Sequence, residues 1–284
     1  MVSVVIPAFN EEDAVAVTVA DVRAALSSVS HEVLVVDDGS SDETASRAIA
    51  AGAKVLSHPH NLGYGAAVMT GIRGAANDTV VITDADGTYP HAEIPRLLQE
   101  FGKGFNMVVG ARAGAQQWDS AVKAPLRIVL KWLVEFTTGR PIPDVNSGLR
   151  VFSKAEIVPY FGHLCNTFSF TTSLTLAYLM TSKFVAFTPI AYNKRIGETK
   201  VRLLRDSLRT LQYIVQAIVY YNPLKMFLLM CALIGVVSLG SLALAAAFGD
   251  PRGLYLGVGG LLIAILVFCL GLLAELLKQI MTKR

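Results

Sequence analysis

The chain has 284 residues, of which 53% are hydrophobic and 17% are charged, and its formal net charge is +3 at pH 7. Soluble domains are usually about a quarter charged, so this composition argues against a purely soluble protein and excludes a disordered one. Three cysteines, Cys165, Cys231 and Cys269, are too few and too widely spaced for a disulfide framework or a thiolate zinc site, which indicates a reducing compartment.

Charge is distributed unevenly along the chain. Residues 1–110 carry 6 Lys and Arg against 14 Asp and Glu, a net charge of −8, whereas residues 111–284 carry 19 against 8, a net charge of +11. The basic, apolar second half suits an anionic membrane surface or a phosphorylated partner. Because its basic residues alternate with long apolar runs, we do not expect nucleic acid to be a partner.

The first 110 residues alternate between strand and helix patterns. The start, Met1–Pro7, lacks the basic n-region of a signal peptide and predicts a buried strand instead. The strands are predicted at Val2–Pro7, Glu32–Asp37, Lys54–Ser57, Thr79–Asp84 and Met107–Gly110, and the helices at Asp13–Ser27, Asp42–Ala51, Tyr64–Ala75 and Ala92–Phe101. Ser41 is the expected N-cap of the second helix. This order predicts an α/β fold with a mostly parallel sheet covered on both faces.

Acidic residues stand at the ends of these strands, where ligands of such sheets bind. Asp84 and Asp86, in an extended Asp-x-Asp segment, can both point at one hard cation, and Mg²⁺ usually takes one or two carboxylates together with phosphate oxygens. Asp37 can accept a hydrogen bond from the N–H edge of a base. The histidines of the predicted loops, namely His58, His60, His91 and His163, are expected to be solvated rather than metal-bound.

Two basic amphipathic segments follow. Lys123–Phe136 carries Lys123, Arg127 and Lys131 at successive helical turns beside an apolar face, which suits either a membrane-interface helix over about residues 122–138 or an ordinary helix with a solvated basic face. Trp118 and Trp132 are either interface anchors or core residues. A second amphipathic helix, over residues 201–222, is suited to lie in the lipid headgroup layer.

The C-terminal region, residues 223–284, contains two long apolar segments. Residues 226–248 and 254–277 each exceed the roughly 20 residues that cross a bilayer, and Glu275 is their one charge. They predict a transmembrane hairpin, with a pair of buried core helices as the alternative. Lys and Arg flank both outer ends, which places both ends and the preceding domain, residues 1–200, in the cytoplasm. The small residues Gly235, Gly240 and Ser241 are compatible with packing into a homo-oligomer.

The second half of the predicted domain is rich in cations and poor in acids. No Asp or Glu lies between Glu156 and Glu198. Asp144 is either a general base or a residue that orders its loop. Arg150 is either one of the cations of the site or a residue that pairs with a carboxylate behind the site. Arg127 and Lys131 lie one helical turn apart and can close on one phosphate. A cationic site without an evident base favours a phosphate nucleophile, which is already ionised.

Five motifs, in this order, resemble those of family 2 glycosyltransferases with a GT-A fold: Pro7-Ala-Phe-Asn-Glu-Glu12, Val36-Asp-Asp-Gly-Ser-Ser-Asp42, Asn61-Leu-Gly-Tyr-Gly65, Asp84-Ala-Asp-Gly87 and Asn146-Ser-Gly-Leu-Arg150. The segment Arg195–Lys200 is similar to the basic segment of the polyprenyl-phosphate branch, of which dolichol-phosphate mannose synthase is typical. The resemblance covers about residues 1–225. It implies a Rossmann-like GT-A domain that transfers a hexose, with inversion, from GDP-mannose or UDP-glucose to a polyprenyl or dolichyl phosphate, using Mg²⁺ or Mn²⁺.

The resemblance also implies roles for individual residues. The nucleotide sugar is assigned to Pro7, Ala8, Asn10, Glu11, Asp37, Gly63, Asp84, Ala85, Asp86 and Arg112, and the metal to Asp84 and Asp86. The acceptor phosphate is assigned to Arg127, Lys131, Ser147 and Lys200. Catalysis is assigned to Asp86, Arg112, Arg127 and Lys131.

The sequence departs from the family pattern at two positions. Thr88 stands where several relatives carry a glutamine that adds a metal ligand, and Lys131 stands where a small hydroxyl residue is expected. Two other functions compete with the first. A processive polysaccharide synthase would carry a Gln-x-x-Arg-Trp segment, which this chain lacks. A non-catalytic nucleotide-sugar-binding scaffold would not require the acidic motifs to be intact.

Overall fold

The computed structural model describes residues 1–113, 124–193 and 203–282. The chain separates into two compact units, Met1–Ile214 and Val215–Arg284. The division between them falls inside helix α8 (Leu203–Tyr221), whereas the sequence suggested limits at residues 200 and 222.

The first unit is built on a seven-stranded sheet in the order β3-β2-β1-β4-β6-β5-β7. Its strands are β1 (Val2–Ala8), β2 (His31–Asp37), β3 (Lys54–Ser57), β4 (Thr79–Ile82), β5 (Met107–Arg112), β6 (Arg150–Ser153) and β7 (Val185–Ile190). Strand β6 is antiparallel to both of its neighbours, and the other pairings are parallel. The prediction of a mostly parallel α/β sheet is therefore confirmed, while β6 and β7 were not among the predicted strands.

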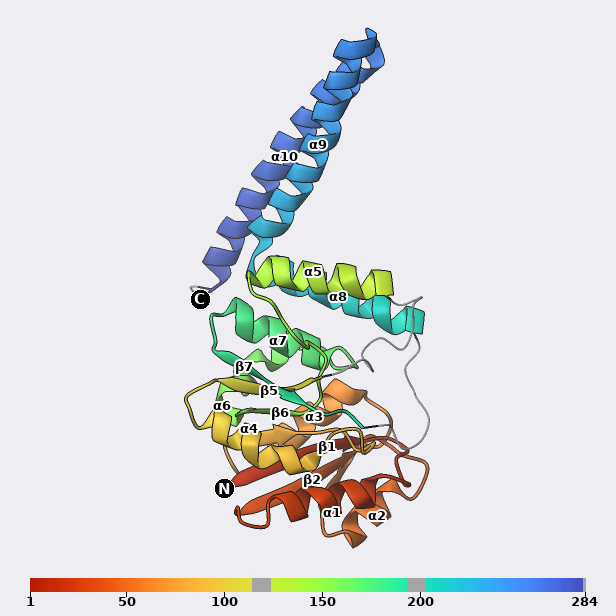
Figure 1. Ribbon diagram of the computed structural model, residues 1–284, viewed down its shortest axis with the longest axis vertical. Coiled ribbons are helices and arrows are strands. Elements are labelled where there is room, and N and C mark those ends of the chain that lie inside the picture. The colour runs from red at the N-terminus through yellow and green to blue at the C-terminus, as the bar shows by residue number, and fades with distance from the viewer. Residues whose placement is uncertain (114–123, 194–202, 283–284) are drawn as a thin grey trace. The chain divides into compact units, whose positions relative to one another are not determined.

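Helices cover both faces of this sheet (Figure 1). They are α1 (Val15–Ala25), α2 (Thr44–Ala50), α3 (Tyr64–Gly74), the 3₁₀ helix η1 (His91–Glu93), α4 (Ile94–Phe101), α6 (Lys154–Ile157), the 3₁₀ helix η4 (Val158–His163) and α7 (Phe170–Met180). Helix α5 (Ala124–Thr138) packs against α7 rather than against the sheet. Helices α1, α2 and α4 share one core cluster with the sheet. Helix α3 packs on the opposite face, where a β-carbon on Gly71 would lie 2.2 Å from Val5 Cγ1. Glycine therefore allows α3 to approach β1 closely.

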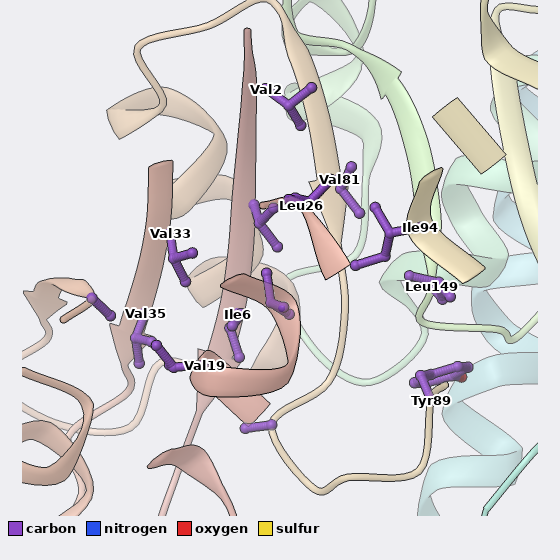
Figure 2. Packing of buried hydrophobic residues seen from close by; sticks show 14 of the residues in the cluster. Val2, Ile6, Val19, Leu26, Val33, Val35, Val81, Tyr89, Ile94 and Leu149 are labelled. Atoms are coloured by element: carbon purple, nitrogen blue, oxygen red, sulfur yellow. The ribbon is translucent and has the colours of Figure 1, made fainter. Parts of the chain in front are cut away.

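Aliphatic side chains from strands and helices fill the core on the α1 side (Figure 2). Ile6 of β1 and Val35 of β2 are fully buried in one cluster with Val19 of α1 and with Leu26, the residue that ends this helix. Because successive strand residues point to opposite faces, one face of β1 and β2 packs in this cluster and the other face packs against α3. Burial of each such side chain contributes about 1.5–3 kcal/mol, which makes the sheet a firm base for the loops at its edge.

The start of α2 differs from the sequence prediction, and Ser41 is not its N-cap. The helix begins at Thr44, and the capping position, Glu43, makes no side-chain capping bond. Asp42 Oδ1 instead accepts hydrogen bonds from the Thr44 N–H (3.0 Å) and hydroxyl (2.5 Å). The Ser41 N–H donates to Asn10 Oδ1 at 2.8 Å. Ser41 is thus part of the contact between the two loops that follow β1 and β2.

The second unit consists of the end of α8 and two long apolar helices, α9 (Pro223–Phe248) and α10 (Pro251–Thr282). They contain the predicted spans, and Gly249 between them adopts a left-handed conformation with φ of 67° that ends α9. Both helices are long and apolar enough to cross a bilayer, and only 6% and 11% of their most apolar 18-residue stretches are buried within the protein. The buried-core alternative is therefore wrong, and α9 and α10 form a candidate transmembrane hairpin.

Glycines of α10 form the seam of this hairpin. A β-carbon on Gly260 would lie 2.0 Å from Ser238 Oγ, and one on Gly257 would lie 2.4 Å from Leu242 Cγ. Small residues allow membrane helices to approach closely in this way. By contrast, a β-carbon on Gly235 or Gly240 would meet no described atom within 4 Å, so these two glycines face away from the seam.

Candidate active site

The polar loops of the first unit meet at one edge of the sheet. Asp37 ends β2 opposite Ala8 of the parallel strand β1, and Asp84 and Asp86 follow β4. Because β6 runs antiparallel, its first residue, Arg150, pairs with Ile82 near the end of β4. The segment 144–149 before β6 therefore lies at the same edge as the carboxyl ends of the parallel strands, where ligands of such sheets bind.

The loops after β1 and β2 are joined by hydrogen bonds. The Asp38 N–H donates to Ala8 O at 2.8 Å, the Asn10 N–H donates to Ser40 Oγ at 2.9 Å, and the Glu11 N–H donates to Thr44 Oγ1 at 2.8 Å. Asn10 has a φ of 50°, a left-handed conformation that asparagine tolerates better than most residues. The predicted nucleotide residues of these two loops are thus brought together, and the Asn10 amide oxygen orders the Ser41 loop.

Asp37 and Asp38 have different partners. Asp37 is 7% exposed and accepts a hydrogen bond from the Ser40 N–H at 3.1 Å. The Asp38 carboxylate accepts from the Leu62 N–H (2.9 Å) and the Gly63 N–H (2.8 Å). Gly63 has a φ of 103°, which few other residues adopt. Asp38 therefore anchors the loop that contains Gly63 beside the site, a role that the sequence analysis missed although Asp38 adjoins Asp37.

His58 supports Asp38, and the prediction that it is solvated is wrong. Its ring is largely buried, with Nδ1 2.7 Å from Asp38 Oδ1 and Nε2 3.0 Å from Thr70 Oγ1. The prediction is also wrong for His91, which is 4% exposed and lies 3.3 Å from the Thr83 hydroxyl through Nε2. Burial lowers the pKa of His91 below its ordinary value. His60 and His163 are exposed, as predicted.

Asp84 lies between a tyrosine and a glycine. Its Oδ1 accepts the Tyr64 hydroxyl at 2.8 Å, and a β-carbon on Gly148 would come within 2.6 Å of its Oδ2. The Gly148 N–H donates to the Tyr89 hydroxyl at 2.6 Å. Burial, reinforced by the charge of Asp84, raises the pKa of Tyr64 well above its ordinary value, so this phenol remains a hydrogen-bond donor to Asp84.

Asp86 and Asp84 offer carboxylate oxygens, the type of ligand that a hard divalent cation prefers. Asp86 is 7% exposed, and its Oδ1 accepts hydrogen bonds from the Thr88 hydroxyl (2.6 Å) and N–H (3.1 Å). Carboxylate oxygens suit Mg²⁺ and Mn²⁺. Within the described ranges there is no group of three or more His, Cys, Asp or Glu side chains placed to bind a metal.

Arg112 and Asp144 form a bidentate ion pair. Arg112 Nε lies 2.7 Å from Asp144 Oδ2, Nη2 lies 2.9 Å from Oδ1, and the Arg112 N–H also donates to Oδ2 at 3.2 Å. The guanidinium stands 5.2 Å from the Tyr192 ring centroid, within cation–π range. Burial by itself raises the pKa of Asp144, but the hydrogen bonds and charge of Arg112 outweigh it and lower that pKa.

Asp144 is consequently a weak base that orders its loop. Its Oδ1 also accepts the Asn146 N–H at 3.0 Å, and its side chain is 5% exposed. Of the two roles left open by the sequence, the geometry supports loop ordering. Across the 163–193 segment, which is fully described, the chain contributes no carboxylate. This part of the site offers no evident general base.

Comparison with known proteins identifies the family of the chain. Residues 3–157 match Glycosyl transferase family 2. The chain belongs to this family. An undecaprenyl-phosphate 4-deoxy-4-formamido-L-arabinose transferase of Salmonella enteritidis PT4 is 28% identical over 83% of this chain and 72% of its own length. A protein of the same description from Enterobacter sp. (strain 638) is 29% identical over 99% of this chain and 89% of its own.

The fold of this family 2 glycosyltransferase also resembles solved structures. Glucosyl-3-phosphoglycerate synthase from Mycobacterium tuberculosis, in complex with phosphoglyceric acid, aligns with a TM-score of 0.62 and 21% identity over 76% of this chain and 79% of its own. The same enzyme with Mn²⁺, uridine diphosphate and phosphoglyceric acid aligns with a TM-score of 0.58 and 21% identity over 76% of this chain and 78% of its own. The GT-A-like α/β fold is thereby confirmed.

The loop before β6 is held from within the glycosyltransferase domain. Arg150 is fully buried and donates to Ser147 O (2.7 Å), Val145 O (2.7 Å) and Thr175 Oγ1 (2.7 Å). Among the described residues it forms no ion pair, and its partners are neutral oxygens, so the structure does not support the alternative in which Arg150 pairs with a carboxylate. Burial lowers its pKa to about 10, which leaves it charged at neutral pH. The Ser147 hydroxyl is also fully buried and donates to Gly110 O at 2.5 Å.

The remaining acceptor residues are only partly described. Lys131 of α5 is exposed, and its Nζ lies 3.8 Å from Glu135 Oε1. Trp132 (49% exposed) and Phe136 (39% exposed) stack with ring centroids 5.4 Å apart, so Trp132 is not a core residue. The side chain of Arg127, and Trp118, Lys123 and Lys200 altogether, lie outside the described residues.

Proposed function

We propose that this glycosyltransferase moves a hexose from a nucleotide-diphosphate donor to a polyprenyl phosphate at the cytoplasmic leaflet, with inversion at the anomeric carbon. The family and the relatives support transfer to a lipid phosphate, since the relatives are described as undecaprenyl-phosphate sugar transferases. The observation that carries the proposal is the bidentate Arg112–Asp144 pair. It supplies a fixed cation and occupies a carboxylate, Asp144, that could otherwise act as the base for a hydroxyl acceptor.

The donor would lie across the loops after β1 and β2. Pro7, Ala8, Asn10 and Glu11 form one wall, which is held in place by the hydrogen bonds to the β2 loop. The largely buried Asp37 carboxylate is suited to accept an N–H of the base. The loop that contains Gly63, anchored by Asp38, would border the nucleotide on the other side together with Ala85. Rigid loops of this kind reduce the entropy cost of binding.

Asp84 and Asp86 would hold the divalent cation and, through it, the donor diphosphate. A bound Mg²⁺ or Mn²⁺ supplies charge neutralisation for the departing diphosphate. Arg112 would add a second positive charge, since its guanidinium is already oriented by Asp144 and Tyr192. Such groups, fixed before the reaction, stabilise the developing charge without reorganisation.

The acceptor phosphate would attack C1 directly. Its ionised oxygen forms the new bond to C1 as the bond from C1 to the diphosphate oxygen breaks, and the electron pair leaves with the nucleoside diphosphate. A phosphate monoester has its second pKa near 6, so no proton has to be removed at neutral pH. Arg127, Lys131 and Lys200 are the proposed phosphate-binding residues. The Ser147 hydroxyl is buried and bonded to Gly110 O, so it could contact the phosphate only if this bond opened. Otherwise Ser147 would contribute by holding its loop in place.

The hairpin would hold the domain at the membrane where the lipid resides. We propose that α9 and α10 cross the bilayer with both outer ends cytoplasmic, as their basic flanks suggest, and that α8 lies in the headgroup layer. On α5, the exposed Trp132–Phe136 pair beside Lys131 has the composition of a membrane-interface surface. In a Trp118→Phe variant, brominated lipids should quench the fluorescence of Trp132. If Trp132 fluorescence in brominated lipids is no weaker than in detergent, this placement is contradicted.

The transfer reaction tests the proposal directly. The full chain in detergent is given radiolabelled GDP-mannose, UDP-glucose or the nucleotide-linked formamido-arabinose named for the relatives. Each donor is offered with a short polyprenyl phosphate, the matching polyprenol, or a free sugar. We expect a hexose donor to label the polyprenyl phosphate, and neither the polyprenol nor the free sugar, and we expect this labelling to require the metal. Labelling of polyprenol or of the free sugar instead would refute a phosphate nucleophile.

A further inference from the structure

Thr88 lies two residues after Asp86, on the turn that follows β4. Its hydroxyl donates to Asp86 Oδ1 at 2.6 Å, and its N–H donates to the same oxygen at 3.1 Å. Thr88 is 1% exposed and Asp86 is 7% exposed, so water competes little with these bonds. A carboxylate oxygen that accepts two bonds from one neighbouring residue cannot rotate without breaking both. Thr88 therefore restrains the orientation of the Asp86 carboxylate.

The backbone of this turn is held independently of the Thr88 hydroxyl. Gly87 adopts a φ of 70°, in the left-handed region. The Asn193 N–H donates to Thr88 O at 2.9 Å, and the Thr18 hydroxyl donates to Ala85 O at 3.0 Å. Loss of the hydroxyl alone should thus leave the course of the turn intact, which makes its role separable by substitution.

We propose that Thr88 is a positioning residue for the divalent cation, acting by holding Asp86 rather than by binding the metal. The proposal rests on the proposed function, in which Asp86 binds that cation. A glutamine at this position is long enough to be a ligand itself, whereas the shorter threonine side chain is already used on Asp86 Oδ1. Hydrogen bonds to a metal-binding carboxylate orient it, and their loss typically weakens metal affinity about 10- to 100-fold.

Mn²⁺ binding tests this inference without reliance on turnover. Free Mn²⁺ is measured by electron paramagnetic resonance during titration of the full chain in detergent, with UDP and with GDP in parallel. Thr88→Val keeps the shape of the side chain but removes the hydroxyl, and Thr88→Ser keeps the hydroxyl. We expect Thr88→Val to weaken Mn²⁺ binding about 10- to 100-fold and Thr88→Ser to bind like the wild type. Activity of Thr88→Val should recover largely at high Mn²⁺, because the ligand Asp86 is still present.

A matched control separates this effect from loosening of the loop. Thr18→Val removes another buried threonine hydroxyl that bonds the same loop, at Ala85 O, and it should leave Mn²⁺ affinity unchanged. Equal Mn²⁺ affinity in the wild type and Thr88→Val would overturn the positioning role of Thr88 but leave the proposed metal site intact. Absence of Mn²⁺ binding in the wild type would instead overturn the metal site of the proposed function. If Thr88→Val does not fold, Thr88→Ala is measured with the same expectation.

Discussion

The Arg112–Asp144 pair allows the roles of the two residues to be separated by a double-mutant cycle. Asp144 is 5% exposed and Arg112 25% exposed. Removal of one partner from a buried pair costs about 3–5 kcal/mol. Because Arg112 is partly hydrated, we expect about 2–3 kcal/mol here. If this energy serves to orient Arg112 for the transition state, Asp144→Asn should lower kcat/KM about 30- to 150-fold.

The cycle consists of Asp144→Asn, Arg112→Met and the double variant, each assayed for kcat/KM with labelled donor and polyprenyl phosphate. If Asp144 acts only through Arg112, the double variant should be no slower than Arg112→Met. A general base would act separately, and the two losses would then multiply. Multiplied losses, or a loss above about 10⁴-fold for Asp144→Asn, would refute the positioning role and restore Asp144 as a candidate base.

Three further predictions follow from particular contacts. Gly148→Ala should lower activity at least about ten-fold, because its β-carbon would lie 2.6 Å from Asp84 Oδ2; unchanged kcat/KM would contradict this. Gly260→Leu should lower the thermal stability of the hairpin in detergent, whereas Gly259→Leu, which faces open space, should not; equal melting curves would refute the seam. Because the folded pKa of Asp144 is depressed, its contribution to stability is present above its unfolded pKa of about 3.9 and is lost as the pH falls through the lower folded value. Calorimetry should therefore show a smaller loss of stability below about pH 4 in Asp144→Asn than in the wild type.

The parallel strands could be predicted because their β-branched runs and acidic ends are local in the sequence. Strands β1, β2 and β4 were expected nearly where they occur, and so were the carboxylates that follow them. The hairpin could be predicted equally well, since a long apolar segment is recognisable from its composition alone. These features depend on a few neighbouring residues and require no knowledge of how distant segments pair.

The rest of the site depends on pairings that the sequence does not reveal. Strand β6 runs antiparallel, and only this direction brings Gly148 against Asp84 and Asp144 against Arg112. The two members of the latter pair are 32 residues apart, and both remain compatible with several roles until their contact is known. In the same way, His58 lies in a polar loop, and its burial follows from the position of Asp38 in the folded chain.

The Asp86 turn illustrates the same limit at short range. The sequence shows that Thr88 replaces an expected glutamine, but it does not show what the threonine contacts. In the structure, its hydroxyl bonds to Asp86 and its backbone carbonyl accepts the Asn193 N–H. A departure from a family pattern therefore acquired a physical interpretation only when the local geometry was known.

The identity of the released nucleotide and of the lipid product tests the central claim most directly. Phosphorus NMR can follow the full chain as it consumes an unlabelled donor and a short polyprenyl phosphate. Attack by the lipid phosphate on C1 predicts release of a nucleoside diphosphate and a lipid product with a single phosphorus, in which the anomeric configuration of the sugar is inverted. Release of a nucleoside monophosphate, or a lipid product with two phosphorus atoms, would show that the diphosphate itself is attacked and would contradict the account.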